Sequence, residues 1–215
     1  MSAEAASLGE RPVVHVVEDH DSSRKATARV LRTAGHAVRL YASADEFLAK
    51  MPAGPGCLVL DLKLPGPSGL DLQERLTTAQ NPMPVVFLSG HGDVPKTARA
   101  MKAGAVDFLA KPVSAPALLD AVARALVNDA EDRAVRARKR ELRRRYESLT
   151  PREREVLAYV ISGHLNKQTA FDLGTSEHTI KVHRGRLMQK LEADSVADLV
   201  RMASDLGISP VGKIR

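Results

Sequence analysis

Short apolar runs alternate with helical patterns five times along the first 128 residues, and this alternation constrains the fold more than any other feature. The apolar runs are mostly continuous, as expected for strands buried on both faces of a parallel sheet. They lie at Val13–Val17, Ala37–Tyr41, Cys57–Leu60, Val85–Leu88 and Val106–Leu109. The helical patterns lie at Ser22–Thr33, Ala44–Lys50, Ser68–Thr78, Val94–Ala103 and Ala115–Val127. The sequence therefore predicts an α/β domain over residues 11–127, a doubly wound (βα)5 parallel sheet with right-handed crossovers.

The rest of the chain is helical in pattern. Residues 128–148 are rich in Ala, Glu and Arg and contain no Pro or Gly, which predicts a helical, semi-rigid linker. A solvated helix is favoured over one that pairs with a partner helix. The weak apolar seam of such a pairing would be Leu126, Ala130, Ala134, Ala137 and Leu142. Residues 149–209 predict an all-α, four-helix domain. Its helical patterns cover Pro151–Ser162, Asn166–Leu173, Ser176–Leu191 and Ser195–Leu206.

Composition narrows the class of protein. Of the 215 residues, 44% are hydrophobic, which is enough for a packed core and excludes wholesale disorder. The single cysteine, Cys57, excludes intrachain disulfides and thiolate-ligated zinc, and it favours a reducing compartment. No apolar run approaches the roughly 20 residues of a membrane helix, and the N-terminus lacks the features of a signal peptide. We therefore expect a soluble, cytoplasmic protein that makes no membrane contact.

Polar residues gather where the predicted strands end. Glu18 and Asp19 follow the first strand, Asp61 the third, Ser89 the fourth and Lys111 the fifth. In a doubly wound sheet, ligands bind at the edge where the carboxyl ends of the strands meet. Neighbouring carboxylates repel one another unless a hard divalent cation such as Mg²⁺ offsets the repulsion. A lysine and a hydroxyl at the same place suit the oxygens of a phosphoryl group.

Five short segments at these strand ends resemble the receiver domain of bacterial two-component response regulators. They are Glu18-Asp19, Leu60-Asp61-Leu62-Lys63-Leu64-Pro65-Gly66, Ser89-Gly90-His91-Gly92, Met101-Lys102-Ala103-Gly104-Ala105-Val106-Asp107-Phe108-Leu109 and Lys111-Pro112. Each segment alone is a weak signal, but five in order at the right strand ends are very specific. The resemblance covers residues 13–125.

The resemblance implies a phosphoacceptor and a metal site. Asp61 resembles the aspartate that takes a phosphoryl group from a sensor histidine kinase. Asp19 would ligate Mg²⁺ directly and Glu18 through water, with Asp61 and the backbone carbonyl of Lys63 completing the protein ligands. Glu18 departs from the family pattern, in which aspartate is more usual, and this puts the fine geometry of the metal site in doubt.

The resemblance also implies a conformational switch. Ser89 matches the hydroxyl that turns toward the new phosphoryl group, and Phe108 matches the aromatic that moves inward behind it. Lys111 would pair with the phosphoryl charge. The Lys111–Pro112 bond is expected to be cis.

Other α/β site types fit the residues less well. Haloacid-dehalogenase-like phosphatases need a second carboxylate two residues after the first, where this chain has Lys63. Nucleotide-binding domains need a Gly-rich turn after the first strand, where this chain has Glu18-Asp19-His20-Asp21. A receiver-like domain that is never phosphorylated usually lacks one of the acidic residues, the acceptor or the lysine, all of which are present. His20 and His91 are interpreted as surface-loop residues.

The C-terminal helices have the dimensions of a helix-turn-helix, with Gly174 in the turn. One face of Ser176–Leu191 is apolar and consists of Ile180, His183, Leu187 and Leu191, where His183 is interpreted as a packing residue. The opposite face is basic, which suits insertion into the DNA major groove, although a protein-binding module has a similar pattern. Residues 129–148 carry eight basic and five acidic side chains and residues 149–215 carry ten and eight, a mild pointer to a polyanionic partner.

Three segments of this region resemble the LuxR-type DNA-binding domain, so the whole chain is identified as a member of the FixJ/NarL family. They are Leu149-Thr150-Pro151-Arg152-Glu153-Arg154-Glu155-Val156-Leu157, Asn166-Lys167-Gln168 and Thr179-Ile180-Lys181-Val182-His183-Arg184. The resemblance implies that Lys181 and Val182 face base edges. It implies phosphate contacts from Asn166, Lys167, Arg184, Arg186 and Lys190. Gly185 departs from the larger residue usual there, at a cost of about 1 kcal/mol in a helix interior. We hypothesise a close approach of its backbone to DNA or to another helix.

The sequence thus predicts a phosphorylation-activated transcriptional regulator. Phosphorylation of Asp61 is expected to promote a homodimer that binds promoter DNA with two-fold symmetry. The alternative is a phosphorylation-dependent adaptor whose C-terminal helices bind protein and never DNA. Enzymatic activity is expected at most as slow self-dephosphorylation of Asp61.

Overall fold

The computed structural model describes residues 11–78, 83–90 and 94–212, and the chain divides into two compact units between Arg133 and Ala134. Within the described residues, the first unit contains a single five-stranded sheet. Its strands are β1 (Val13–Val17), β2 (Ala37–Tyr41), β3 (Gly56–Asp61), β4 (Val85–Ser89) and β5 (Asp107–Ala110). They pair in the order β2-β1-β3-β4-β5, and every pairing is parallel. The predicted doubly wound parallel sheet is confirmed.

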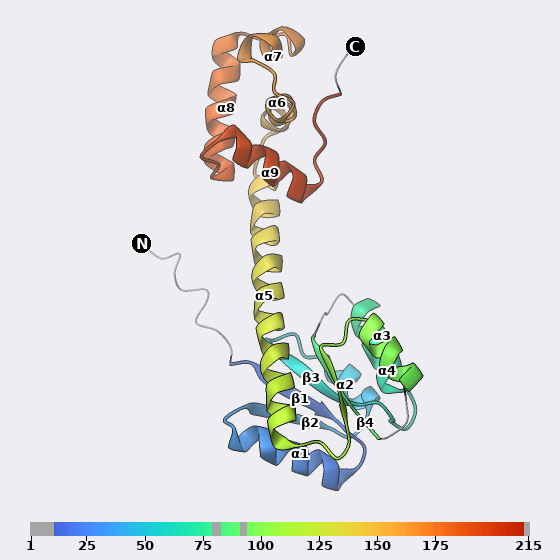
Figure 1. The fold of residues 1–215 in the computed structure, drawn as a ribbon. Helices are drawn as coiled ribbons and strands as arrows, with labels where there is room; N and C mark the ends of the chain where they lie inside the picture. The colour runs from blue at the N-terminus through green and yellow to red at the C-terminus, as the bar shows by residue number, and fades with distance from the viewer. Residues whose placement is uncertain (1–10, 79–82, 91–93, 213–215) are drawn as a thin grey trace. The chain divides into compact units, whose positions relative to one another are not determined.

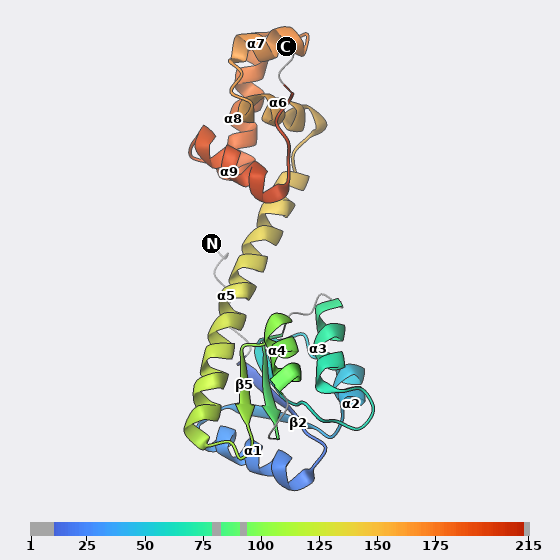
Figure 2. The same cartoon turned by 45° about the vertical axis from the view of Figure 1, so that its right-hand side comes forward.

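Helices cover both faces of this sheet (Figures 1 and 2). They are α1 (Asp21–Thr33), α2 (Ala44–Lys50), α3 (Gly69–Thr78), α4 (Val94–Lys102) and α5 (Ala115–Glu147). Leu31 of α1 and Val122 of α5 belong to the core on one face of the sheet. Phe47 of α2 and Leu72 of α3 belong to the core on the other. All six residues of β3 are buried because helices lie on both sides of it, as the continuous apolar run predicts.

The helix α5 runs without a break from Ala115 to Glu147, so the last helix of the α/β domain and the predicted linker are one helix. Beyond Arg133 most of its side chains are exposed as far as Arg140. Neither α5 nor any other helix in the described ranges is both long and apolar enough to span a bilayer.

The contacts of α5 with the sheet continue past residue 127, where the domain was expected to end. The buried carboxylate of Asp129 accepts a hydrogen bond of 2.8 Å from the backbone N–H of Gly56. Arg133 donates to both oxygens of Asp129, at 3.0 and 2.8 Å, and to the backbone carbonyls of Ala53 and Gly54. We call these contacts the Asp129–Arg133 clasp. It fixes α5 to the segment that leads into β3.

The second unit is a small helical domain. Its helices after α5 are α6 (Pro151–Ile161), α7 (Asn166–Asp172), α8 (Glu177–Leu191) and α9 (Val196–Leu206). They enclose a core that includes Leu157, Ile180, Leu187 and Leu199, all almost fully buried. The predicted all-α domain and the apolar back of α8 are confirmed.

Local signals in the sequence fix the ends of these helices. Thr150 and Glu153 form a capping box, in which each side chain accepts from the other residue's backbone N–H, at 3.2 and 2.8 Å. Ser195 caps α9 by accepting from the backbone N–H of Asp198 at 3.1 Å. Gly174, between α7 and α8, has a φ of 62°, a conformation that glycine adopts without steric cost. The turn of the helix-turn-helix is therefore encoded locally.

A buried histidine gives the α/β domain a stability that should depend on pH. His15 in β1 is 2% exposed, and its Nδ1 lies 3.0 Å from the hydroxyl of Tyr41. Burial, aided by the charge of Arg39, lowers the pKa of His15 from 6.5 to about 4. The unfolded chain therefore takes up a proton at higher pH than the folded chain does. This proton uptake leaves the free energy of unfolding unchanged above pH 6.5. It lowers the free energy of unfolding by up to about 3 kcal/mol as the pH approaches 4.

We expect His15→Gln to lack this part of the pH dependence. Urea unfolding between pH 7 and pH 4.5 should show a wild-type free energy of unfolding that falls more steeply than that of the variant. His36→Gln, which replaces a less buried histidine of the same domain, should follow the wild type. Parallel curves for wild type and His15→Gln would contradict the assignment.

Candidate functional site

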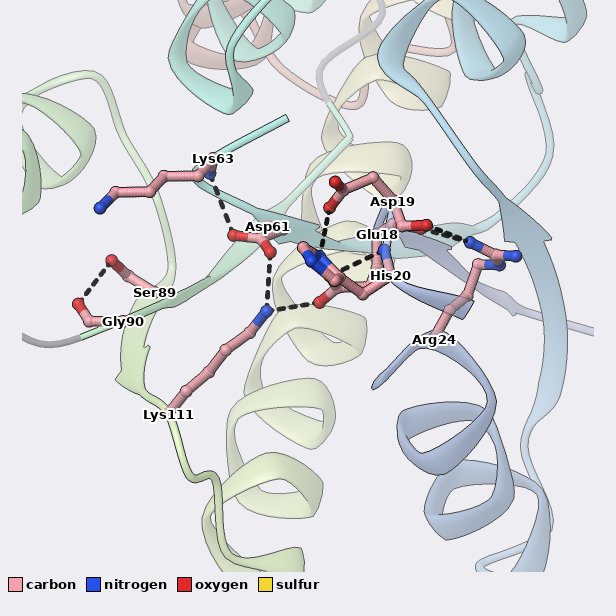
Figure 3. A network of polar contacts seen from close by, with 9 residues as sticks. All are labelled: Glu18, Asp19, His20, Arg24, Asp61, Lys63, Ser89, Gly90 and Lys111. Carbon is pink, nitrogen blue, oxygen red and sulfur yellow. Dashed lines mark hydrogen bonds and ion pairs between the residues drawn. The ribbon is translucent and has the colours of Figure 1, made fainter. Parts of the chain in front are cut away.

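The carboxyl ends of three strands and the residues after β5 bring the predicted phosphoacceptor residues together (Figure 3). Glu18 and Asp19 directly follow β1, Asp61 ends β3 and Ser89 ends β4. Lys111 follows β5, and its backbone N–H donates to the carbonyl of Ser89 at 2.7 Å. The Lys111–Pro112 bond is cis, as expected. The parallel topology thus gathers side chains that are far apart in the sequence.

Lys111 forms an ion pair with two carboxylates at once. Its Nζ lies 2.5 Å from Oε2 of Glu18 and 2.7 Å from Oδ2 of Asp61. Burial raises the pKa of Glu18, and the hydrogen bond from Lys111 offsets this only in part. Burial acts to lower the pKa of Lys111, but its hydrogen bonds to Asp61 and Glu18 outweigh that effect and raise it. The ammonium therefore stays protonated and is the cation that holds the two acids together.

Asp61 is buried and held from two sides. Its Oδ1 accepts a hydrogen bond of 3.0 Å from the backbone N–H of Lys63, while Oδ2 faces Lys111. Gly69, at the start of α3, lies so close that a Cβ there would be 2.5 Å from the backbone carbonyl oxygen of Asp61. This close approach accounts for the glycine, and it fixes α3 against the end of β3.

Glu18, Asp19 and His20 form a second group of potential metal ligands at the same edge. One ligand atom from each residue lies within 4.8 Å of the others. Nδ1 of His20 is 3.0 Å from Asp19 and 3.5 Å from Glu18. Arg24 donates to the backbone carbonyls of Glu18 and Asp19, at 2.7 and 3.1 Å, and so fixes the segment. The side chain of His20 is 74% exposed, in agreement with its interpretation as a surface residue, and it also contacts both acids. The position of His20 directly after the two carboxylates in the sequence could have predicted this contact.

The donor set fits a hard divalent cation. Glu18, Asp19 and Asp61 supply carboxylate oxygens, the ligands that Mg²⁺ prefers. Glu18 is 1% exposed in its side chain and Asp19 28%, so the pair combines a buried acid with one that water can reach. A single ammonium cannot neutralise three carboxylates, so a further positive charge would be stabilised here.

Ser89, at the end of β4, lies beside this group (Figure 3), and Phe108 lies within β5. Ser89 is fully buried, and its hydroxyl donates to the carbonyl of Gly90 at 3.0 Å. Phe108 is partly buried, with its ring centroid 6.2 Å from that of Phe87. His91 and Gly92, which belong to the same receiver-like segment as Ser89, lie outside the described residues.

In the helical unit, α7 and α8 present most of the predicted DNA-binding residues. Lys181, Val182 and Arg186 are exposed on α8, and Lys167 is exposed on α7. Arg184 donates to the side-chain oxygen of Asn166 at 3.2 Å, which joins two predicted phosphate contacts across the helix-turn-helix. The four exposed side chains are therefore accessible to a ligand. Arg184 and Asn166 are held together by their hydrogen bond.

Lys190 departs from this pattern. Its Nζ donates to the carboxylate of Glu153 at 2.7 Å and to the carbonyl of Ser148 at 3.3 Å. Glu153 is 2% exposed and has no other ammonium or guanidinium partner in the described part of the chain. Lys190 thus neutralises a buried acid inside the domain, which argues against the phosphate contact expected of it.

The chain matches two known families of protein domain. Residues 14–123 match the family described as "Response regulator receiver domain". Residues 147–203 match the family described as "Bacterial regulatory proteins, luxR family". Nodulation protein W of Bradyrhizobium diazoefficiens is 46% identical over 200 residues, which are 93% of this chain and 88% of that protein. Transcriptional regulatory protein FixJ of Rhizobium meliloti is 40% identical over 207 residues, 92% of this chain and 97% of FixJ.

Solved structures of response regulators are also similar to this chain. The response regulator StyR is similar with a TM-score of 0.82 and 45% identity, over 91% of this chain and 99% of that one. Full-length FixJ from B. japonicum is similar with a TM-score of 0.56 and 36% identity, over 91% of this chain and 97% of that one. The similarity therefore spans both units.

The shared ammonium makes a prediction about stability. Lys111→Met should lower the free energy of unfolding by about 3–5 kcal/mol at pH 8, because it leaves Glu18 and Asp61 buried together without a cation. The loss should be smaller at pH 5 than at pH 8, because burial raises the pKa of Glu18 and protonation of this acid at lower pH weakens the repulsion. Chemical denaturation at both pH values measures the difference.

Lys25→Met is the matched control. Lys25 forms an exposed ion pair with Asp21, whose removal should cost less than about 1 kcal/mol at either pH. Equal losses for the two variants would show that Lys111 does not hold the carboxylates together.

Proposed function

Because the chain belongs to the response regulators of two-component systems that join a receiver domain to a LuxR-type DNA-binding domain, we propose that Asp61 is its phosphoacceptor. The family consists of transcriptional regulators rather than classical enzymes. The observation that carries the proposal is the pairing of a buried Asp61 with Lys111 at 2.7 Å, beside Glu18 and Asp19. This arrangement offers a nucleophilic carboxylate, a fixed cation and oxygen ligands for a metal at one edge of the sheet.

The proposed reaction transfers a phosphoryl group from a phosphohistidine of a sensor histidine kinase. An oxygen of Asp61 attacks phosphorus, the phosphorus–nitrogen bond breaks, and the imidazole leaves with the electron pair. Glu18, Asp19, Asp61 and the carbonyl of Lys63 would hold Mg²⁺, which supplies positive charge to the phosphoryl oxygens. Lys111 pairs with the new negative charge. Slow hydrolysis of the acyl phosphate by water is the single enzymatic step that we attribute to the chain.

The proposed switch replaces one hydrogen bond with another. The hydroxyl of Ser89 now donates to the carbonyl of Gly90, and it would turn to donate to a phosphoryl oxygen. An ionic acceptor is stronger than a neutral carbonyl, so the added charge favours the turned conformation. Phe108, only partly buried, would move into the space that Ser89 leaves. We propose that this rearrangement promotes a homodimer.

In the dimer, α8 would enter the major groove of promoter DNA in the cytoplasm. Lys181 and Val182 would face base edges. Phosphate contacts would come from Asn166, Lys167, Arg184 and Arg186, while Lys190 is left out because Glu153 holds it. The proposal is supported by the exposure of Lys181 and Val182 and by the basic surroundings of the helix-turn-helix.

A phosphorylation-dependent adaptor remains the alternative function. The two differ in salt dependence, because a protein that neutralises DNA phosphates loses affinity steeply as salt rises. Binding of the full chain to mixed duplex DNA, measured over a series of salt concentrations, should show this loss. Absence of DNA binding at low salt would favour the adaptor.

We expect the wild type, treated with a small-molecule phosphodonor and Mg²⁺, to gain the mass of one phosphoryl group, to dimerise and to bind duplex DNA more tightly. Asp61→Asn should show none of these changes, because it removes the nucleophile and keeps the shape. Asp45→Asn, an exposed aspartate of the same domain, should behave as the wild type. A phosphorylated wild type that stays monomeric, with unchanged DNA affinity, would overturn the switch.

Lys181→Ala should weaken binding to a selected DNA site by about 5- to 150-fold, corresponding to about 1–3 kcal/mol, if Lys181 pairs with guanine. Lys167→Ala should instead weaken all sequences alike and reduce the salt slope by about one unit. Titrations of selected and random duplexes at several salt concentrations separate the two effects. Equal effects of Lys181→Ala on both duplexes would assign Lys181 to phosphate.

A further inference from the structure

Gly185 lies within α8, and no contact inside the domain accounts for a glycine there. Glycine is unfavourable in a helix interior because it loses more backbone freedom than other residues. A Cβ added at Gly185 would meet no atom within 4 Å, so no other described helix of this domain approaches it closely. Of the two explanations that the sequence left open, approach to another described helix of the same domain is therefore excluded. Approach to DNA remains.

Gly185 also lies at the centre of the exposed face of α8. Residues at i−7, i−4, i−3 and i+4 lie on the same side of a helix as residue i. The side chains at these positions, all exposed, are His178, Lys181, Val182 and Gln189. They are longer than the hydrogen of Gly185, so the face has a notch at its centre, with larger side chains on the turns before and after it.

The surroundings of the notch determine what it can accept. Val182, on the preceding turn, is 38% exposed and supplies an apolar wall. The backbone N–H of Gly185 is used within the helix, so the notch offers no free donor to a phosphate oxygen. In the major groove, the one apolar group on a base edge is the 5-methyl of thymine. The notch therefore suits a methyl group better than an anion.

We propose that Gly185 is a specificity-determining residue whose notch receives the methyl group of a thymine in each half-site. This inference rests on the proposed function, since it requires that α8 enters the major groove. An alanine at position 185 would place its own methyl in the space that the thymine methyl takes. The methyl on the protein and the methyl on the base then compete for the same place.

The test compares thymine with uracil, which lacks only that methyl. A duplex is selected from a random pool with phosphorylated full-length wild type, and each thymine is then replaced singly by uracil. For one thymine per half-site, the wild type should bind the thymine duplex about fourfold more tightly, the value of one buried methyl-sized group. Gly185→Ala should lose this preference or bind the uracil duplex more tightly.

Two controls keep the result interpretable. Thermal unfolding should place the helical-domain transition of Gly185→Ala about 4–8 °C higher, because alanine favours the helix and meets no atom. Gln189→Ala, on the same face, should keep the thymine preference. The inference would be overturned if wild type and Gly185→Ala preferred thymine over uracil equally, or if the wild type preferred thymine over uracil at no position. Either result would leave the proposed DNA recognition standing. If the wild type selects no sequence from the pool, the proposed DNA recognition fails, and the inference fails with it.

Discussion

The ammonium of Lys111 lies between two carboxylates that the fold forces together. Parallel strands end at one edge of a sheet, so Glu18 and Asp61 stay close as long as β1 and β3 remain paired. When both acids are ionised, one ammonium leaves the pair with a net negative charge, and Asp19 adds to it. A phosphoryl group would bring roughly two further negative charges. This deficit is the physical reason why a divalent cation should accompany phosphorylation.

The strand β3 is held at both of its ends. Asp61 at its carboxyl end is fixed by Lys63 and Lys111, and Gly56 at its start donates to Asp129 in the Asp129–Arg133 clasp. A Cβ on Gly56 would lie 2.0 Å from the carbonyl oxygen of Val13, so the strand also begins in close contact with β1. Because β3 is fixed at both ends, side chains rather than strands are the parts of the site that can move in response to new charge. Rotation of a hydroxyl and burial of an aromatic ring are responses of that kind.

Patterns of local origin were predictable from the sequence, whereas contacts that depend on a distant partner were not. Buried strands, amphipathic helices and the Thr150 capping box each follow from a few adjacent residues. The carboxylate cluster was predictable because topology alone fixes where strand ends meet. Asp129, by contrast, looks like one acid among several in a charged helix. Its burial depends on Gly56, which lies far away in the sequence.

The helix α8 shows why a glycine can be more informative than a basic residue. Lys190 fitted a phosphate contact by position, yet its long side chain reaches Glu153, a buried acid on another helix. A lysine can satisfy several partners within its reach, so its position does not identify the partner. A glycine has no side chain that could extend to a distant partner, so a group that requires the glycine must approach its backbone directly. Because no described residue of the helical domain fills the space around Gly185, the proposed partner is a group that fits that space closely. Shape, more than charge, then carries the information on this face of α8.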